Sequence, residues 1–240
     1  MKIVCISDTH TKHLQLEIPK GDAIICAGDI TSRGYIEQYE DFLNWYSSLS
    51  HPHKILIAGN HDLGIENGRF DINQMCKDRD IVYLQDEEYL LHNKGEYIKV
   101  WGSPVTPQFS FGWAFNRSTT IEKSMDLEAQ RNGWEYIGNH WDKIPKDVDI
   151  LITHGPPYGI LDEVDGFGED VKHTGCPVLF RKIQELDNLK LHIFGHIHEG
   201  RGIRLLDKFY VNASVLDEYY SPYQSKPFVL NWDNIKKGRF

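Results

Sequence analysis

The stretch Ile3-Val4-Cys5-Ile6-Ser7-Asp8-Thr9-His10 joins a short apolar run to a polar end that carries a carboxylate and an imidazole. The apolar part has the length and the β-branched residues of a buried strand. The same arrangement recurs four times, with a polar cluster directly after an apolar run. The later clusters are Gly28-Asp29, Gly59-Asn60-His61-Asp62, Thr153-His154-Gly155 and Gly195-His196-Ile197-His198. Because open α/β sheets place their sites at the carboxyl ends of strands, these clusters are expected to meet in one site.

Segments with helical periodicity alternate with these apolar runs, which favours an α/β layered fold. Apolar residues at three- and four-residue spacing predict a helix over 34–48, with Thr31 or Ser32 as its cap. A second helix is predicted over 177–186, and Pro177 suits its first turn.

The last third of the chain changes to shorter apolar runs separated by turn-forming residues. The runs 202–206, 209–212 and 228–230 predict antiparallel strands that close a second sheet. No internal repeat, low-complexity tract or linker divides the chain, so we expect one domain over 1–240.

Residues 101–145 are harder to assign, because prolines and aromatics precede a polar stretch with helical propensity. We interpret this segment as a long insertion with one or two helices over the edge of the sheet. Long structured loops in compact domains are usually functional, so the segment is a candidate substrate lid. The alternative is a solvated surface excursion without a role in the site.

The composition is that of a soluble globular protein: 40% of the 240 residues are hydrophobic and 25% are charged. No apolar stretch approaches the roughly 20 residues of a transmembrane helix, and the start of the chain has no signal-peptide pattern. We therefore expect the cytoplasm as the compartment. The chain shows neither a CxxC pair nor a secretory context, so we expect reduced thiols at the four cysteines, which are Cys5, Cys26, Cys76 and Cys176.

The net charge of −9, from 35 acidic and 26 basic residues, argues against an extended nucleic-acid-binding surface. It does not exclude a small phosphorylated substrate. Two divalent cations would bring four positive charges against the two negative charges of Asp8 and Asp29, so the pocket itself would be positive.

The residue types of the clusters are those of a metal site. Asp8 and His10 are two residues apart and project to one side of an extended backbone, and His196 and His198 repeat this spacing. Carboxylate, imidazole and amide ligands suit divalent ions such as Mn, Fe, Zn, Co or Ni. The absence of thiolates near the clusters argues against a closed structural zinc site.

A centre with two metals needs a ligand that can bridge them. A carboxylate can donate from both oxygens and an imidazole cannot, so Asp29, alone in its cluster, is the predicted bridge. The ions would lie roughly 3.5–4 Å apart and share a hydroxide nucleophile. Asp-x-His, Gly-Asp and His154, each taken alone, are typical of a turn or a hydrogen-bonded loop histidine, whereas Gly-Asn-His-Asp and Gly-His-x-His are rarer. All five in one order favour the metal site.

In this order the clusters resemble the signature of the calcineurin-like metallophosphoesterase superfamily, D-x-H, G-D, G-N-H-[DE], H and G-H-x-H. Further segments resemble its metallophosphoesterase-domain-containing branch, among them Trp101-Gly102-Ser103-Pro104, Trp113-Ala114-Phe115-Asn116, His173-Thr174-Gly175-Cys176 and Tyr210-Val211-Asn212-Ala213-Ser214. The resemblance covers nearly the whole chain. It implies a four-layer α/β/β/α sandwich with a dinuclear site at the loop edge of the sheets.

The resemblance also implies a role for each cluster residue. Asp29 would bridge the ions, His61 would stabilise or protonate the leaving group, and Asp62 would help to orient His61. The remaining six would be terminal ligands, with Asp8, His10 and His198 on the first metal and Asn60, His154 and His196 on the second.

The implied activity is hydrolysis of a phosphate ester, and the branch favours diesters, including small cyclic nucleotides. A phosphomonoesterase on the same site is the alternative. Monoesterases often use an extra cation to hold the substrate dianion, and the candidates, none of them in a recognised motif, are Arg33, Arg117, Arg181 and Arg201. A metal-containing interaction module without turnover is a further alternative. Candidates for the substrate rim are Asn116, His173, Cys176 and Asn212, for which loop packing and capping is the competing interpretation. The oligomeric state stays open.

Overall fold

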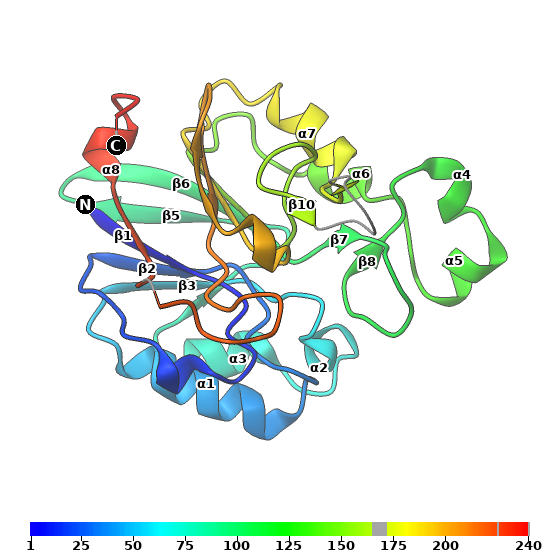
Figure 1. The fold of residues 1–240 in the computed structure, drawn as a ribbon, viewed down its shortest axis with the longest axis horizontal. Coiled ribbons are helices and arrows are strands. Elements are labelled where there is room, and N and C mark those ends of the chain that lie inside the picture. Colours follow the sequence, from blue (N-terminus) through cyan, green and yellow to red (C-terminus); the bar gives the residue numbers. More distant parts are fainter. Residues whose placement is uncertain (165–171, 225, 240) are drawn as a thin grey trace.

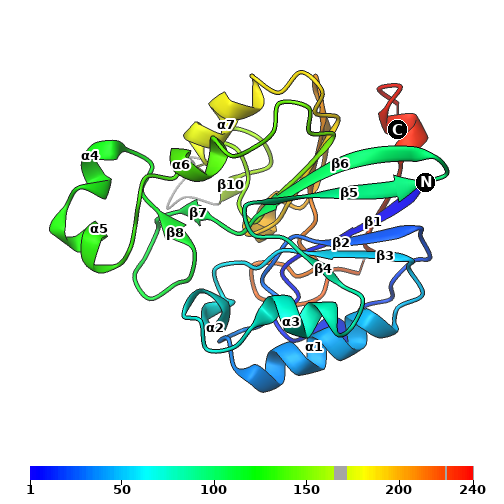
Figure 2. The ribbon, with the colours of Figure 1, turned by 180° about the vertical axis from the view of Figure 1, so that it is seen from behind.

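Two β-sheets face each other in the computed structural model, which describes residues 1–164, 172–224 and 226–239. Helices pack on the outer face of each sheet, so the molecule has the four layers α/β/β/α (Figure 1). The view from behind shows the same order of layers (Figure 2). The layered α/β architecture expected from the sequence is confirmed. Within the described residues, no helix combines the length and apolar character needed to span a bilayer.

The first sheet has five strands in the order β15-β1-β2-β3-β4. Strands β1 to β4 run parallel, and β15 pairs with β1 antiparallel. In chain order the strands are β1 (Lys2–Ile6), β2 (Ala23–Cys26), β3 (His53–Leu56), β4 (Val82–Tyr83) and β15 (Phe228–Asn231).

The second sheet has six strands in the order β13-β14-β12-β9-β6-β5. The four central strands run parallel, and β13 and β5 are antiparallel edges. The strands are β5 (Glu87–Asn93), β6 (Glu96–Ser103), β9 (Ile150–Thr153), β12 (Leu191–Phe194), β13 (Gly202–Leu205) and β14 (Phe209–Asn212).

Helices α1 and α3 lie on the first sheet, and α6 and α7 lie on the second (Figure 1). Two strand pairs of two residues each lie outside the main sheets, β7 (Thr106–Pro107) with β8 (Asn116–Arg117), and β10 (Glu163–Val164) with β11 (Lys172–His173). The helices are α1 (Ile36–Ser48), α2 (Leu63–Glu66), α3 (Ile72–Lys77), α4 (Ile121–Ser124), α5 (Leu127–Arg131), α6 (Gly138–Trp141), α7 (Pro177–Ile183) and α8 (Trp232–Ile235), with 3₁₀ turns at His13–Gln15 and His198–Gly200.

Strand β1 shows why the layers form, since its side chains alternate between two cores. Ile3 and Cys5 are fully buried between the two sheets. Val4 and Ile6 are fully buried on the other face, against the helix layer. A strand covered on both faces is a continuous apolar run, which is how the sequence marks it. All four cysteines are buried and free of disulfides.

The two predicted helices form with shifted ends. Helix α1 begins at Ile36 after Tyr35, which gives no side-chain cap. Thr31 does not cap it, because its hydroxyl accepts a hydrogen bond from Gly34 N (3.1 Å) instead. Helix α7 begins at Pro177 as predicted but ends at Ile183, three residues early.

The prediction for the last strands was partly wrong. Strands β13 and β14 are antiparallel, but β14 joins the second sheet parallel to β12. Strand β15 belongs to the first sheet, where it covers the edge of β1 and buries Leu230 in the core between the sheets. An apolar run does not reveal its neighbour, because pairing depends on which sheet edge is open.

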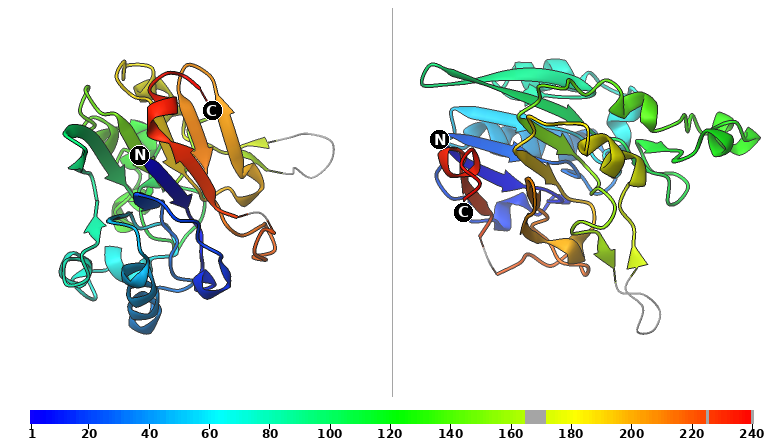
Figure 3. Two further views of the ribbon diagram at one scale, coloured as in Figure 1. Left: turned by 90° about the vertical axis from the view of Figure 1, so that its left-hand side faces the viewer. Right: turned by 90° about the horizontal axis from the view of Figure 1, so that it is seen from above.

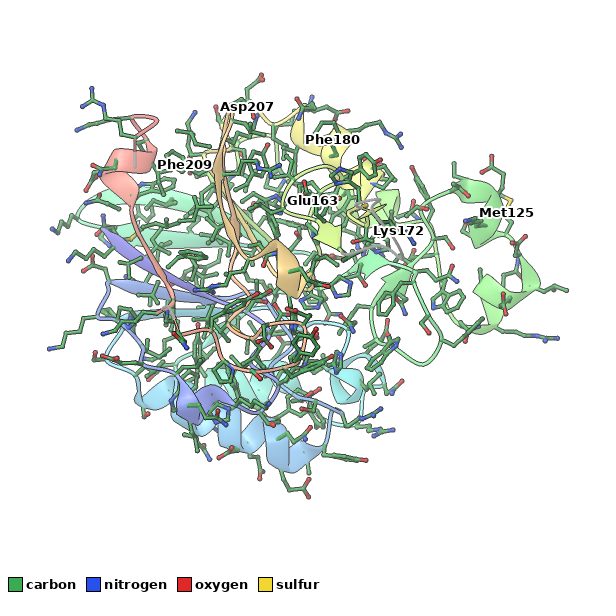
Figure 4. The ribbon with its side chains drawn as sticks, viewed as in Figure 1. Met125, Glu163, Lys172, Phe180, Asp207 and Phe209 are labelled. Carbon is green, nitrogen blue, oxygen red and sulfur yellow. The ribbon has the colours of Figure 1, made fainter. Side chains whose placement is uncertain are left out.

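The predicted insertion starts later than residue 101. Trp101 is 1% exposed in β6 and belongs to the core beneath α6 and α7, so the excursion begins after Ser103. It forms three short helices rather than one or two. Helices α4 and α5 project away from the sandwich (Figure 3), with Met125 far out on this projection (Figure 4).

Candidate metal centre

The five polar clusters lie together where the two sheets present the carboxyl ends of their strands. Asp8, Asp29 and Asn60 follow β1, β2 and β3 of the first sheet. His154 and His196 follow β9 and β12 of the second. The parallel direction of these strands brings five loops to one edge, which is the arrangement expected from the sequence.

One half of the site is formed by Asp8, His10 and His198. Each offers a ligand atom, and these atoms all lie within 4.8 Å of one another. The Nε2 atom of His198 is 3.6 Å from Asp8 Oδ1. His10 is 3% exposed, and neither of its ring nitrogens has a hydrogen-bond partner. A buried imidazole without partners is costly, and a metal ion at this position would satisfy it.

The other half is formed by Asp29, His154 and His196, with Asn60 beside them. The Nε2 atom of His154 lies 2.9 Å from Asn60 Oδ1 and 3.3 Å from Asp29 Oδ2. The same oxygen of Asp29 lies 3.7 Å from Nε2 of His10 in the first half. Asp29 therefore stands between the halves, where a bridging ligand would be. Carboxylate, imidazole and amide groups fit divalent cations.

Main-chain carbonyls fix the orientation of two histidines. Nδ1 of His154 lies 2.8 Å from the carbonyl oxygen of Ala27, and Nδ1 of His198 lies 2.8 Å from that of Asp217. A proton on each Nδ1 satisfies these contacts and leaves Nε2 as the electron-pair donor. This is the usual support for histidine ligands of metals.

The carboxylate of Asp8 is held from two sides. The backbone N–H of His196 donates to both of its oxygens, at 3.1 and 3.0 Å, and the hydroxyl of Ser214 donates to Oδ2 at 2.7 Å. Gly195 makes the approach possible, because a Cβ atom there would lie 2.1 Å from Asp8 Oδ2. Any larger residue would displace the carboxylate.

The backbone is strained at four of the seven predicted ligands. Positive φ angles occur at Asp8 (57°), His10 (39°), Asp29 (53°) and His196 (69°). Non-glycine residues rarely adopt this conformation, and such strain concentrates at functional sites.

Burial and charge shift the pKa values of the histidines in the site in opposite directions. Burial lowers the pKa of His10 to about 4 and that of His196 to about 3. Burial also acts on His154 and His198, but the carboxylates of Asp29 and Asp8, respectively, outweigh it and raise both pKa values to about 9. The metal-free site thus holds positive charge next to its two carboxylates.

His61 lies against the site with its ring oriented by the main chain. Its Nδ1 is 3.0 Å from the carbonyl oxygen of Ser32, and the backbone N–H of His61 donates to Asp29 Oδ1 at 2.8 Å. The ring meets that of His10 edge to face, with centroids 4.4 Å apart. A ring nitrogen of His61 also lies within 4.8 Å of ligand atoms of His10 and Asp29, so these three residues form a further group that could hold a metal ion.

Asp62 acts on loops and not on the ring of His61. Its carboxylate accepts hydrogen bonds from Gly59 N (2.8 Å), Thr31 N (3.0 Å) and the Thr31 hydroxyl (2.8 Å). Burial raises its pKa to about 7. We expected Asp62 to help orient His61. Its contacts do so only indirectly, because the carboxylate ties together the two loops that carry Asp29 and His61.

A cavity of about 190 Å³ opens above the predicted ligands. Three aromatic side chains join histidines and Asp29 in its walls, while lysine and arginine are absent from its described lining. The lining residues are His10, Asp29, Asn60, His61, Phe109, Trp113, His196, His198 and Tyr220.

The four residues predicted for the substrate rim do not line this cavity. The amide of Asn116 donates to the carbonyls of Ser110 (2.9 Å) and Trp113 (3.3 Å), and that of Asn212 donates to Ile197 O (2.7 Å). These two asparagines hold neighbouring loops in place.

The other two rim candidates also make local contacts. Nδ1 of His173 lies 2.8 Å from Asp162 Oδ1. Cys176 is buried at the start of α7, where its thiol accepts a hydrogen bond from Leu179 N (3.3 Å). The competing interpretation, loop packing and capping, describes all four contacts. Nothing in their sequence context distinguished the two roles.

The four candidate arginines also lie outside the lining. Arg117 donates to Glu66 Oε1 (2.9 Å), and Arg201 packs on the ring of Phe228. Arg181 lies within helix α7, and Arg33 is exposed.

Comparison with known proteins identifies the family of the chain. A family model described as calcineurin-like phosphoesterase matches residues 1–200. Human metallophosphoesterase domain-containing protein 1 is 34% identical over 254 residues, spanning 96% of this chain and 70% of the relative. The Caenorhabditis elegans protein named UPF0046 protein C25E10.12 is 31% identical, spanning 90% of this chain and 76% of its own. The crystal structure of phosphopantetheinyl hydrolase from Mycobacterium tuberculosis shares the fold, with a TM-score of 0.55 at 16% identity over 95% of each chain.

The family depends on two metal ions, and the groups of carboxylate and imidazole side chains in this site are able to hold metal ions. By both the family match and the similarity to relatives over most of its length, the chain belongs to the calcineurin-like phosphoesterases, in the branch of the metallophosphoesterase domain-containing proteins, and is a metal-dependent phosphoesterase.

Proposed function

We propose that this phosphoesterase acts on phosphodiesters, including small cyclic nucleotides. The observation that carries the proposal is the lining of the cavity, which offers three aromatic side chains and no lysine or arginine among its described residues. Sites for a monoester dianion often hold an additional cation beside the metals. A diester carries one negative charge and a second organic group, which aromatic walls suit.

We assign one ion to Asp8, His10 and His198, the other to Asn60, His154 and His196, and the bridge to Asp29. The distances of Asp29 Oδ2 to His10 and His154, 3.7 and 3.3 Å, support the bridge. Bound divalent ions such as Mn would supply an ionised water as nucleophile and positive charge for the phosphoryl oxygens.

His61 is assigned to the leaving group. With its Nδ1–H donated to the carbonyl of Ser32, Nε2 is the atom that can hold a proton for the departing alkoxide. Its ring lies in the cavity wall beside Trp113, with centroids 4.3 Å apart. A ring fixed in the wall of the cavity supports this role, because a general acid has to reach the leaving group.

The excursion after Ser103 is proposed to cover the site through its first part only. Phe109 and Trp113 line the cavity, whereas α4 and α5 project away from the sandwich (Figure 3). We also propose that residues 1–240 act as one domain, because the site takes side chains from both sheets. The four free thiols support the expectation of a reducing compartment, the cytoplasm.

A comparison of substrates tests the proposal. Rates would be measured on p-nitrophenyl phosphate, bis(p-nitrophenyl) phosphate and 2′,3′- and 3′,5′-cyclic nucleotides, each with Mn, Ni, Zn and Mg. We expect kcat/KM to be higher for the diester than for the monoester with the best metal. A higher value for the monoester would contradict the diester assignment while keeping the phosphoesterase.

A further inference from the structure

Tyr220 is the member of the cavity lining whose position in the sequence gave no sign of a role. It lies in the loop between β14 and β15, about 160 residues after His61 in the chain. Its ring centroid is 4.8 Å from that of His10, 5.3 Å from His198 and 6.4 Å from His61. Tyr220 therefore covers the half of the centre that contains Asp8, His10 and His198.

A second aromatic wall comes from the excursion after Ser103. The ring of Phe109 lies 5.2 Å from that of His196, in the other half of the centre. Trp113 lies 4.3 Å from His61 and stacks with Phe109 at 6.3 Å. The centre is thus flanked by aromatic rings from two loops, each beside a different half.

The loop that carries Tyr220 is held in one shape. The backbone N–H groups of Tyr219 and Ser221 donate to Asp217 Oδ1, at 3.0 and 2.7 Å, and Tyr220 N donates to Asp217 O at 2.9 Å. Tyr220 has a φ of 60°, a conformation that these bonds and the ammonium group of Lys12, bonded to its carbonyl, maintain. The carbonyl of Asp217 also orients His198, so the loop and the centre are built together.

The wall that carries Trp113 is anchored as well. Ala114 N donates to Asn60 O at 2.9 Å, which ties the wall to a predicted ligand. Phe115 N donates to Glu66 Oε2 at 2.7 Å, and the amide of Asn116 binds the carbonyl of Trp113. Rings that are fixed before a ligand arrives bind it with a smaller loss of conformational entropy.

We infer that Tyr220 and Trp113 form an aromatic subsite that selects phosphate esters carrying a planar ring, such as an aryl group or a nucleobase. The inference rests on the proposed function, because it assigns the organic group of the substrate of the same centre. Rings in proteins and ligands attract one another by stacking and edge-to-face contact, and a flat group suits walls of this kind. Tyr220 is then a specificity-determining residue.

Binding of two phosphinates tests the subsite without turnover, since a phosphoesterase does not cleave a P–C bond. Methyl(phenyl)phosphinate and dimethylphosphinate carry the same single negative charge and two organic groups, as a diester does, and differ in the ring. Their affinities would be measured by calorimetry in protein of known metal content. We expect the wild-type chain to prefer methyl(phenyl)phosphinate at least about fivefold, the lower end of what stacking of one ring contributes.

The variants separate the ring from other effects. Y220A and W113A should bring the preference close to 1, and Y220L, which keeps packing volume beside His10, should do the same. Y220F should keep the preference, because it keeps the ring. Tyr219 is 79% exposed and lines no part of the cavity, so Y219A is the matched control and should behave as wild type.

Two results would overturn the subsite: no preference in the wild-type chain, or a wild-type preference in Y220A, Y220L and W113A. A ring preference without hydrolysis of any ester would leave the subsite standing and contradict the proposed function instead. Hydrolysis of a phosphate ester without a preference for the ring would contradict the subsite and leave the proposed function standing.

Discussion

Asp29 gains its importance from position, because one of its oxygens lies within 3.7 Å of imidazoles in both halves of the centre. The other oxygen accepts the N–H of His61 at 2.8 Å, which fixes the backbone of the proposed general acid. The carboxylate is fully enclosed, and the surrounding histidines hold its pKa well below the usual range in spite of burial. In the proposed assignment, one residue therefore organises both the metals and the proton donor.

Replacing His61 with alanine separates metal binding from proton donation to the leaving group. We expect His61→Ala to retain both metals and to lose about 10²- to 10⁴-fold in kcat, the contribution of a positioned general acid. The loss should be largest for poor leaving groups and small for p-nitrophenolate, which departs without a proton. Elemental analysis and a plot of log kcat against leaving-group pKa would check both points.

Asp29→Ala is the matched contrast, because it should lose bound metal. A His61→Ala variant that turns over a poor leaving group at the wild-type rate would contradict the role of the imidazole. A loss of metal from this variant would instead make His61 a ligand, in the grouping with His10 and Asp29.

The seven predicted ligands could be picked out in the sequence because residues of these types directly follow apolar runs. Tyr220 was not, since a single tyrosine in a polar loop forms no pattern, and its place over His10 depends on where the loop after β14 folds. His173 and Cys176 show the converse. They belong to a segment that resembles the family, yet their contacts are local.

At the scale of elements, the central strands position the site, and one of them, β12, buries a histidine. His192 is fully buried in this strand, four residues before His196, with Nε2 2.8 Å from the hydroxyl of Thr153. Burial lowers its pKa to about 3. The folded chain therefore keeps this imidazole neutral at pH values where the unfolded chain protonates it.

The free energy of unfolding should fall as the pH drops below about 6.5, the pKa of an unperturbed histidine, because the unfolded state then binds one more proton. Between pH 7 and pH 5 this group accounts for about 2 kcal/mol. His192→Gln should remove that part of the pH dependence. Urea unfolding of the metal-free protein at both pH values would measure it.

His92→Gln is the control, because His92 is exposed in β5. It should keep the wild-type pH dependence. Equal losses of stability on acidification in wild type and His192→Gln would show that the buried imidazole does not titrate as described.

The strands themselves were largely predictable, and their partners were not. Runs buried on both faces, such as Ile3 to Ile6, identify central parallel strands. The runs 209–212 and 228–230 are as apolar, yet one joins β12 and the other joins β1. That choice depends on chain-distant sheet edges, which local periodicity does not contain.

At the scale of the molecule, the two sheets share one core and one site. Ile25 and Ile57 of the first sheet pack with Ile152 and Ile193 of the second, directly behind the clusters. The predicted ligands complete this contact at the loop edge, where each sheet contributes histidines or carboxylates. A cation bound there would join the two sheets.

Metal loading should therefore stabilise the whole sandwich. At a free metal concentration of 100 times Kd, each bound ion is expected to add about 2.7 kcal/mol to the free energy of unfolding. Urea unfolding with saturating Mn and with chelator would measure the difference. Asp29→Ala should show little of it, and an equal response in that variant would place the stabilising ions elsewhere.

The most direct test joins metal content to turnover in one preparation. The chain would be stripped with chelator and titrated with Mn, and bound metal and the hydrolysis rate of bis(p-nitrophenyl) phosphate would be followed together. We expect no activity in the stripped protein, two ions per chain at saturation, and a rate that rises with binding of the second ion. Undiminished hydrolysis without metal, or a chain that holds two ions and cleaves no phosphate ester, would show that this centre is not a two-metal phosphoesterase.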